Sequence, residues 1–142
     1  MSEIDNTKGF LKYLLENCLF AYSELCKVNK ALVEGMSLAS GADVNHLGAM
    51  NRMIQDYLII RVAGLFDEDK QNRGVASFGK LFSDNDDFKK IKSEKVIKYI
   101  INQRHNFVAH NNQDHTENNF PITAEICDTN LKELLERLER LL

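Results

Sequence analysis

The sequence contains no tryptophan and one proline, and its 44% hydrophobic and 27% charged residues are typical of an ordinary globular protein rather than a disordered or fibrous chain. Its three cysteines, Cys18, Cys26 and Cys127, form no Cys-x-x-Cys pair, which favours reduced thiols over a disulfide framework. No apolar run approaches the roughly 18 residues that span a bilayer, and the first residues lack the pattern of a signal peptide. We therefore expect a cytoplasmic protein with no membrane partner.

The chain also lacks an excess of basic residues. Eighteen Lys plus Arg against 21 Asp plus Glu give a net charge of −3. This balance does not provide the electrostatic footprint of extended nucleic-acid binding. If RNA is a substrate, its contacts should be local, and a short single-stranded loop suits this charge better than a long duplex.

Helical periodicity is the main feature that the sequence does contain. Apolar residues recur at spacings of three and four through most of the chain. A chain of 142 residues is long enough to bury one core of the usual size. We predict an all-α fold, an antiparallel bundle of four to five helices that spans residues 1–142 as a single domain.

The first and last helices have the clearest apolar faces. The first should run from about Thr7, as its N-cap, to Val33. Its predicted face contains Leu11, Leu15, Cys18, Leu19, Tyr22, Leu25, Cys26, Leu32 and Val33. Asp128 is predicted to cap the last helix, whose stripe contains Leu131, Leu134, Leu135, Leu138, Leu141 and Leu142. This leucine seam suits either a bundle core or a partner.

The second helix should span about residues 44–66 and carries an arginine at an unexpected place. Its predicted stripe contains Leu47, Met50, Ile54, Tyr57, Leu58 and Leu65. At about 100° per residue, Arg61 falls inside this stripe. Two interpretations remain open: Arg61 extends to solvent or pairs with loop acids, or it supports a functional site together with Asp67 at the helix end.

Between the second helix and the next lies a polar connection, residues 67–85, with a short apolar knot that should form one helical turn. The third helix should start between Asp86 and Ser93. The aspartates at its start lack the glycine and glutamate of a calcium loop. His105, His110 and His115 are five residues apart, which does not stack them on one helix face. We therefore expect no metal site and no cofactor.

The stretch 102–112, Asn-Gln-Arg-His-Asn-Phe-Val-Ala-His-Asn-Asn, is where we expect function, because it ends an apolar helical run with charged and polar groups. Arg104 falls inside the apolar arc set by Val96, Ile100 and Ile101. A guanidinium cannot lose its proton, so on that face it needs a carboxylate, a ring of carbonyls, a bound anion or a wet groove between subunits. His110 lies about 9 Å further along an ideal helix, on the flank of the same arc.

This pattern of an arginine, a polar residue, four further residues and a histidine resembles the signature of the HEPN superfamily, with Arg104, His105 and His110 in the matching positions. The phrase Arg-His-Asn-Phe-Val-Ala-His-Asn is also similar to the AbiU2-like branch, which is associated with phage abortive infection. A second segment, Arg61-Val-Ala-Gly-Leu-Phe-Asp67, is similar to the Arg…Leu-Phe-Asp segment of that branch. The two segments cover about a fifth of the chain.

The resemblance implies a HEPN-like helical bundle that acts as a metal-independent endoribonuclease of the toxin or phage-defence type. Its active site would be shared across a homodimer, with Arg104 and His110 as catalytic residues. His105, Asn106 and Asn111 would support the catalytic residues, and Arg61 and Asp67 would contact these residues without touching the substrate. Histidine suits proton transfer, and a guanidinium binds phosphate oxygens in pairs. An antitoxin protein would be a further partner.

Two alternatives belong to other classes of protein. One is a catalytically inactive HEPN-like module for dimerisation or regulation. The other is a helical protein-interaction domain in which Arg104 has a structural role. The acidic balance of the whole chain favours these alternatives, whereas the intact set of Arg104, His105 and His110 favours the nuclease.

Overall fold

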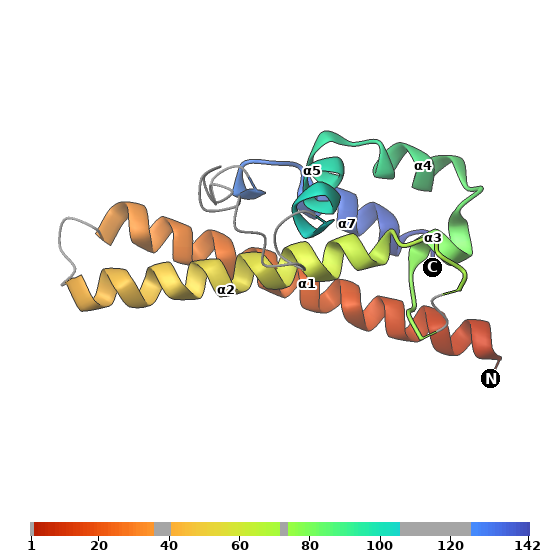
Figure 1. Cartoon of the computed structure of the whole chain (residues 1–142), viewed down its shortest axis with the longest axis horizontal. Coiled ribbons are helices and arrows are strands. Elements are labelled where there is room, and N and C mark those ends of the chain that lie inside the picture. Colours follow the sequence, from red (N-terminus) through yellow and green to blue (C-terminus); the bar gives the residue numbers. More distant parts are fainter. Residues whose placement is uncertain (1, 36–40, 72–73, 106–125) are drawn as a thin grey trace.

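The computed structural model describes residues 2–35, 41–71, 74–105 and 126–142, with only the backbone at residues 35 and 41–44. This part of the chain contains six helices and no strand. Two long helices, α1 (Glu3–Gly35) and α2 (Gly41–Leu65), form an antiparallel hairpin, and the shorter helices gather around the end of the hairpin that holds the N-terminus (Figure 1). The all-α prediction is confirmed for these residues, although they form six helices where four to five were expected.

Helix α1 begins four residues earlier than predicted, at Glu3, because Ser2 and Asp5 cap it. The Ser2 hydroxyl oxygen accepts a hydrogen bond from the Asp5 amide at 3.1 Å and donates one to the Asp5 carboxylate at 2.8 Å. The Ser2 hydroxyl is also the main cause of a lowered pKa at Asp5. Thr7, the predicted N-cap, instead lies inside the helix and donates to the Glu3 carbonyl at 3.0 Å.

The buried face of α1 follows the prediction in the middle of the helix and departs from it at the far end. Leu11, Leu15, Cys18 and Leu25 are completely buried. Val33 was expected in the core but is 72% exposed, because among the described helices only α2 lies beside this end of the hairpin (Figure 1). The core therefore occupies the half of the hairpin that the shorter helices cover.

Helix α2 buries Leu58 and Leu65 of the predicted stripe, but its buried face is turned towards Ile59 and Val62. Leu58, Ile59, Val62, Leu65 and Phe66 are buried, together with the polar side chains of Asn51 and Gln55. Met50, Met53, Tyr57 and Ile60 are exposed, although Met50 and Tyr57 were placed in the apolar stripe. The prediction was wrong for Met50 and Tyr57 because apolar residues cover a wide arc of this helix, so their spacing alone does not select the buried side.

The chain leaves α2 through a turn at Asp67 and enters the short helix α3 (Phe78–Phe82). The Ser77 hydroxyl donates to the Asp67 carbonyl and accepts a hydrogen bond from the Lys80 amide at 3.1 Å, so it both closes the turn and caps α3. Gly79 packs directly on this turn: a Cβ atom there would lie 2.4 Å from the Asp67 carbonyl oxygen. The predicted helical turn in this connection is confirmed.

The predicted third helix is two helices, α4 (Asp86–Lys92) and α5 (Lys95–Gln103). Asn85 caps α4 by accepting a hydrogen bond from the Phe88 amide at 3.0 Å. Ser93 ends α4, and its hydroxyl donates to the Lys90 carbonyl at 2.7 Å. This break turns the chain, so that α4 and α5 cover different parts of the core.

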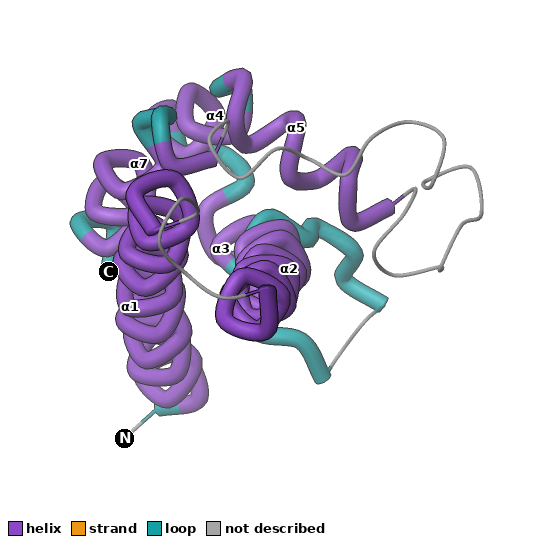
Figure 2. Tube along the Cα trace, turned by 90° about the vertical axis from the view of Figure 1, so that its left-hand side faces the viewer, coloured by secondary structure: helices purple, strands orange, loops and turns teal. Residues whose placement is uncertain are grey.

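The last described helix is α7 (Leu131–Glu139). Leu131, Leu134, Leu135 and Leu138 are completely buried, so the predicted stripe belongs to the core. The expected Asp128 cap is wrong: Asn130 is the N-cap residue, and the Thr129 hydroxyl accepts from the Leu131 amide at 3.3 Å. Figure 2 views the hairpin end-on and shows α7 beside α1, with α5 over α2. Within the described residues, no helix combines the length and apolar character that a membrane span requires.

Candidate functional site

Helix α5 positions the predicted motif because one of its faces is held firmly against α2. Val96, Ile97 and Ile100 are buried there, and Ile101 is half-buried beside them. On the opposite side, Lys98 and Asn102 are exposed. A helix anchored by three buried side chains places the residues at its end in a defined position.

Arg104 and His105 lie at this end, in a turn with the wider hydrogen-bonding pattern of a π-helix. Such turns are frequent at functional sites. Both side chains are exposed, so within this chain Arg104 is not buried with Val96 and Ile100. Past Ile101 the helix extends beyond the buried patch, and the guanidinium is therefore available to an anion from outside.

The other predicted site residues are only partly described. His110, Asn106 and Asn111 lie outside the described residues, as do Phe107 and Val108. Two of the three histidines that are five residues apart, His110 and His115, also lie outside the described residues. Among the described residues, no three His, Cys, Asp or Glu side chains gather as metal ligands would.

Arg61 and Asp67, which were expected to support the catalytic pair, lie in different parts of the structure. Arg61 is exposed on α2, and its guanidinium carbon lies 5.6 Å from the centre of the Tyr57 ring. Asp67 is half-buried in the turn after α2, where its carboxylate accepts a hydrogen bond from the Asp69 amide at 2.9 Å. The Leu65 and Phe66 side chains before it are core residues. This segment therefore builds the turn that leads into α3.

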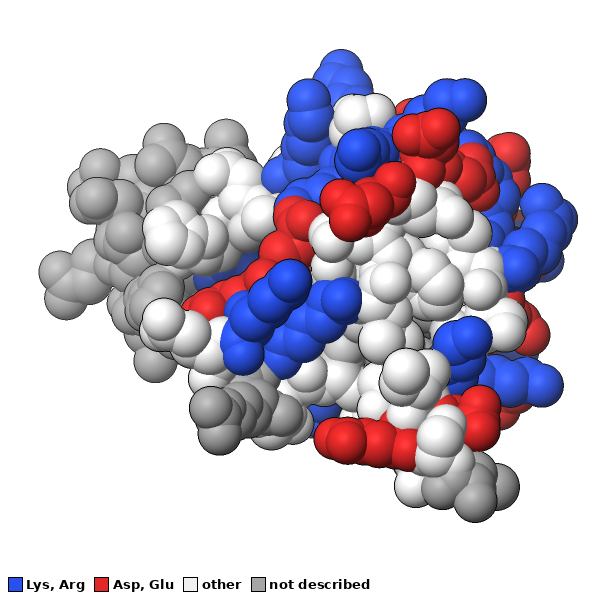
Figure 3. All heavy atoms as spheres, turned by 90° about the vertical axis from the view of Figure 1, so that its right-hand side faces the viewer, with Lys and Arg blue, Asp and Glu red and all other residues white. Residues whose placement is uncertain are grey.

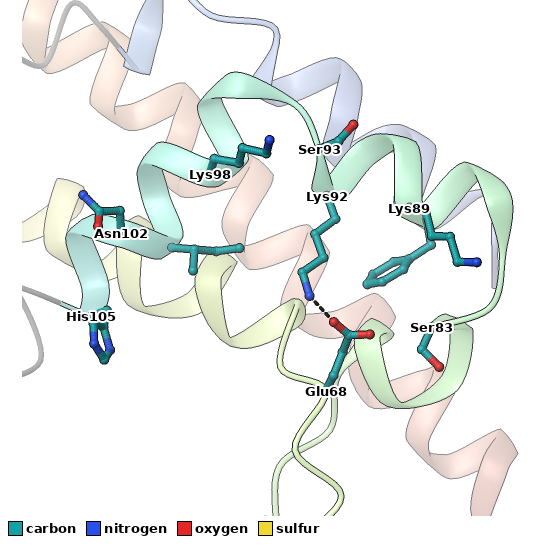
Figure 4. Close-up of a pocket in the computed structure, with 10 residues that line it drawn as sticks. Glu68, Ser83, Lys89, Lys92, Ser93, Lys98, Asn102 and His105 are labelled. Carbon is teal, nitrogen blue, oxygen red and sulfur yellow. Dashed lines mark hydrogen bonds and ion pairs between the residues drawn. The ribbon is translucent and has the colours of Figure 1, made fainter.

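Sequence reasoning missed a hollow of about 620 Å³ that lies between α4, α5 and the turn after α2. Figure 4 shows Asn102 and His105 at one end of it and Lys89 and Ser83 at the other. Its lining consists of basic, hydroxyl, amide and apolar side chains with one carboxylate: Glu68, Ser83, Phe88, Lys89, Lys92, Ser93, Lys98, Ile101, Asn102 and His105. The hollow thus begins at the motif and leads away from it along α4.

The charge near this hollow differs in sign from that of the whole chain. Between Phe88 and His105 the sequence has six basic residues and one acidic residue, Glu94, whereas the remaining residues have 12 basic and 20 acidic ones. Figure 3 shows basic side chains along the upper edge of the molecule, where α4 lies, with acidic groups between them. The local count over residues 88–105 was the signal available in the sequence, and averaging over all 142 residues concealed it.

One ion pair crosses the hollow: the Lys92 ammonium contacts the Glu68 carboxylate (Figure 4). The side chains of Lys92 and Glu68 are 37% and 42% exposed. An ion pair this open to solvent contributes little to stability, because water and salt screen it. The pair can therefore separate when another anion reaches Lys92.

A second group of reactive side chains, around Tyr22 and Cys127, has a structural role. The Tyr22 hydroxyl donates to the Cys127 carbonyl at 2.8 Å. Burial, with smaller contributions from Cys26 and Asp128, raises the pKa of Cys127 from 9.0 to about 12. A thiol that stays protonated at neutral pH is a poor nucleophile. We therefore assign no reaction to this group.

The described arrangement provides cations for phosphate and an imidazole beside them. Guanidinium and ammonium groups bind phosphate oxygens, and histidine is the side chain suited to proton transfer near neutral pH. Comparison with known proteins adds no name to this site, because no family model, no curated protein and no solved structure matches the chain.

Proposed function

We propose that the chain is a HEPN-type, metal-independent endoribonuclease of the toxin or abortive-infection class, with a HEPN-like fold and a composite active site at a homodimer interface. The observation that carries this proposal is the exposure of Arg104 and His105 at the end of α5, where His105 also lines a hollow that contains lysines. The sequence motif places His110 six residues after Arg104.

In the proposed reaction the RNA supplies its own nucleophile. A base removes the proton of a ribose 2′-OH, and the 2′-oxygen bonds to the adjacent phosphorus. The bond from phosphorus to the 5′-oxygen breaks, and an acid protonates that oxygen. The products are a 2′,3′-cyclic phosphate end and a 5′-hydroxyl end, so no oxidant, metal or further reactant is consumed.

Arg104 and His110 are the proposed catalytic residues in this reaction. The Arg104 guanidinium stabilises the negative charge that develops on the phosphate oxygens. His110 exchanges protons with the reacting oxygens. One copy of the chain supplies one such histidine, whereas two copies across a twofold axis supply both an acid and a base. His105, Asn106 and Asn111 orient the imidazole or the phosphate.

The exposed apolar side of α2 supports the dimer. Met50, Met53, Tyr57 and Ile60 recur at spacings of three and four and are between 36% and 71% exposed. Exposed apolar stripes of this kind favour contact with another protein surface. The same observation favours the second candidate function, a helical interaction module without catalytic activity, which binds an antitoxin or another protein partner.

Cleavage of total cellular RNA in the presence of EDTA separates the two functions. The nuclease proposal expects cleavage by the wild type and loss of cleavage in His110→Ala. His46→Ala is the matched control, because His46 is an exposed histidine on α2. Cleaved RNA should accept a 3′ adaptor only after its cyclic phosphate ends are removed. If wild type and His110→Ala are equally inactive, the interaction module is favoured instead.

A further inference from the structure

The lysines of the hollow come from two helices and form one continuous line. Lys89 and Lys92 are three residues apart on α4, and Lys98, Asn102 and His105 follow one another at spacings of four and three on α5. Each set therefore occupies one helix face, and both faces line the same hollow. Figure 4 shows this line leading from Lys89 to His105, which directly follows Arg104 in the sequence.

The lysines of the lining favour a flexible anion, and most of the remaining lining surface is apolar. Lys89, Lys92 and Lys98 face a single carboxylate, that of Glu68. Lys89 and Lys98 form no ion pair with any described residue. Ser83, Ser93 and Asn102 add hydrogen-bonding groups, and Phe88 and Ile101 provide an apolar floor. A volume of about 620 Å³ is within the range of small-ligand sites.

We propose that this hollow binds the phosphates of single-stranded RNA next to the bond that is cleaved, and that Glu68 competes with RNA for Lys92. The inference rests on the proposed nuclease function, because the line of lysines ends at His105, the residue after Arg104. With Arg104 on the reacting phosphate, the neighbouring nucleotides extend along α5 and α4, where the ammonium groups contact successive phosphates.

The proposal also predicts that Glu68 weakens RNA binding, whereas the lysines strengthen it. Its carboxylate holds Lys92 in the free protein, so RNA must displace it. Both partners are partly exposed, and the exchange of one anion for another at Lys92 therefore has a small free-energy cost. Removal of the Glu68 charge should strengthen RNA binding, whereas removal of the lysine charges should weaken it.

The test measures binding without cleavage. A fluorescent single-stranded oligonucleotide with 2′-O-methyl groups has no nucleophile, so fluorescence anisotropy reports affinity alone over a range of salt concentrations. The variants are wild type, Lys89→Gln with Lys98→Gln, and Glu68→Gln. The matched control is Lys12→Gln with Lys30→Gln, which removes two exposed lysines from α1 and changes the net charge equally.

We expect the Lys89 and Lys98 double variant to bind about tenfold more weakly and to reduce the slope of log affinity against log salt by about 1.4, or about 0.7 for each lost phosphate contact. Glu68→Gln should bind about two- to fivefold more tightly, the size expected for an exposed ion pair. The α1 control should match the wild type. Equal affinities of the two double variants, or no change in Glu68→Gln, would overturn the inference.

The outcome separates this inference from the nuclease proposal. If the protein binds the oligonucleotide through Lys89 and Lys98 but cleaves no RNA, the binding site is supported and the nuclease proposal is contradicted. If the wild type and the Lys89 and Lys98 variant cleave RNA with the same KM, the nuclease proposal is supported and the binding site is contradicted. The same variant can also be tested with a fluorescent acidic peptide. If the Lys89 and Lys98 variant binds RNA as tightly as the wild type but loses binding to the peptide, the hollow belongs to a protein partner and the inference is overturned.

Discussion

The Tyr22 hydroxyl of α1 donates a 2.8 Å hydrogen bond to the backbone carbonyl of Cys127, 105 residues further along the chain. This bond ties the residues just before α7 to the middle of α1. Tyr22→Phe should lower the free energy of unfolding by about 1 kcal/mol, because the Cys127 carbonyl loses its donor. Tyr13→Phe is the matched control, since Tyr13 is 57% exposed and should change stability by less than about 0.5 kcal/mol. Equal urea midpoints for the two variants would contradict this assignment.

Gly79 should tolerate no side chain. A Cβ atom there would lie 2.4 Å from the Asp67 carbonyl oxygen and 2.8 Å from its carbon, and backbone atoms cannot rotate away as a side chain does. We expect Gly79→Ala to destabilise the protein by about 1–3 kcal/mol through overpacking. Gly9→Ala should act in the opposite direction, stabilising by about 0.5–1 kcal/mol, because nothing lies within 4 Å of its Cβ position in α1. Urea unfolding of both variants checks the two signs together.

The buried thiol of Cys18 predicts loss of stability at high pH. Burial raises its pKa from the usual 9.0 to about 12, while the nearby Arg61 charge opposes the shift. Below pH 9 the thiol is protonated in both states and its contribution is fully present. Above pH 9 the unfolded state releases the proton first, so the free energy of unfolding falls as the pH rises towards 12. Urea unfolding at several alkaline pH values should show a shallower decline for Cys18→Ala, and parallel declines would be the contrary result.

Arg104 and His110 should act as one catalytic unit. Each alanine substitution should lower the rate of RNA cleavage by about 100-fold or more, because it removes phosphate stabilisation or proton transfer. The double variant should lose far less than the product of the two effects, since residues of one unit are not additive. Arg140→Ala, at an exposed arginine after α7, is the control for lost charge. Multiplicative losses in single-turnover assays would argue against a shared step.

The exposed face of α2 should control the oligomeric state. Met53 is 71% and Ile60 is 42% exposed, and carboxylates at both positions would be desolvated in a dimer that buries this face. Met53→Glu with Ile60→Glu should weaken dimerisation by about tenfold or more. Asn45→Glu, at an exposed polar position of the same helix, should have no such effect. Sedimentation at tens of micromolar checks this, and a monomeric wild type would contradict the proposed dimer.

The sequence by itself determined the features that depend on one-sided apolar spacing. The core faces of α5, with Val96, Ile97 and Ile100, and of α7, with its leucines, follow directly from periodicity because polar residues cover the other side of each helix. The helical turn at Phe78–Phe82 was also predictable, since its apolar residues stand alone in a polar connection. The helix start at Glu3 was not predicted. The Ser2 hydroxyl caps the helix, which begins four residues before the predicted start, and apolar spacing does not show where a cap lies.

Only the tertiary structure decided which side of α2 is buried and which charges meet. Leu58 is buried and Ile60 is exposed because α1 and α5 cover only part of the wide apolar arc of α2. The lysines of α4 and α5 reach the same hollow as Glu68 because Ser93 breaks the helix between them and the turn at Asp67 brings Glu68 opposite. Contacts between different helices depend on the angles at which the helices pack, and the spacing of residues along the sequence contains no information about those angles.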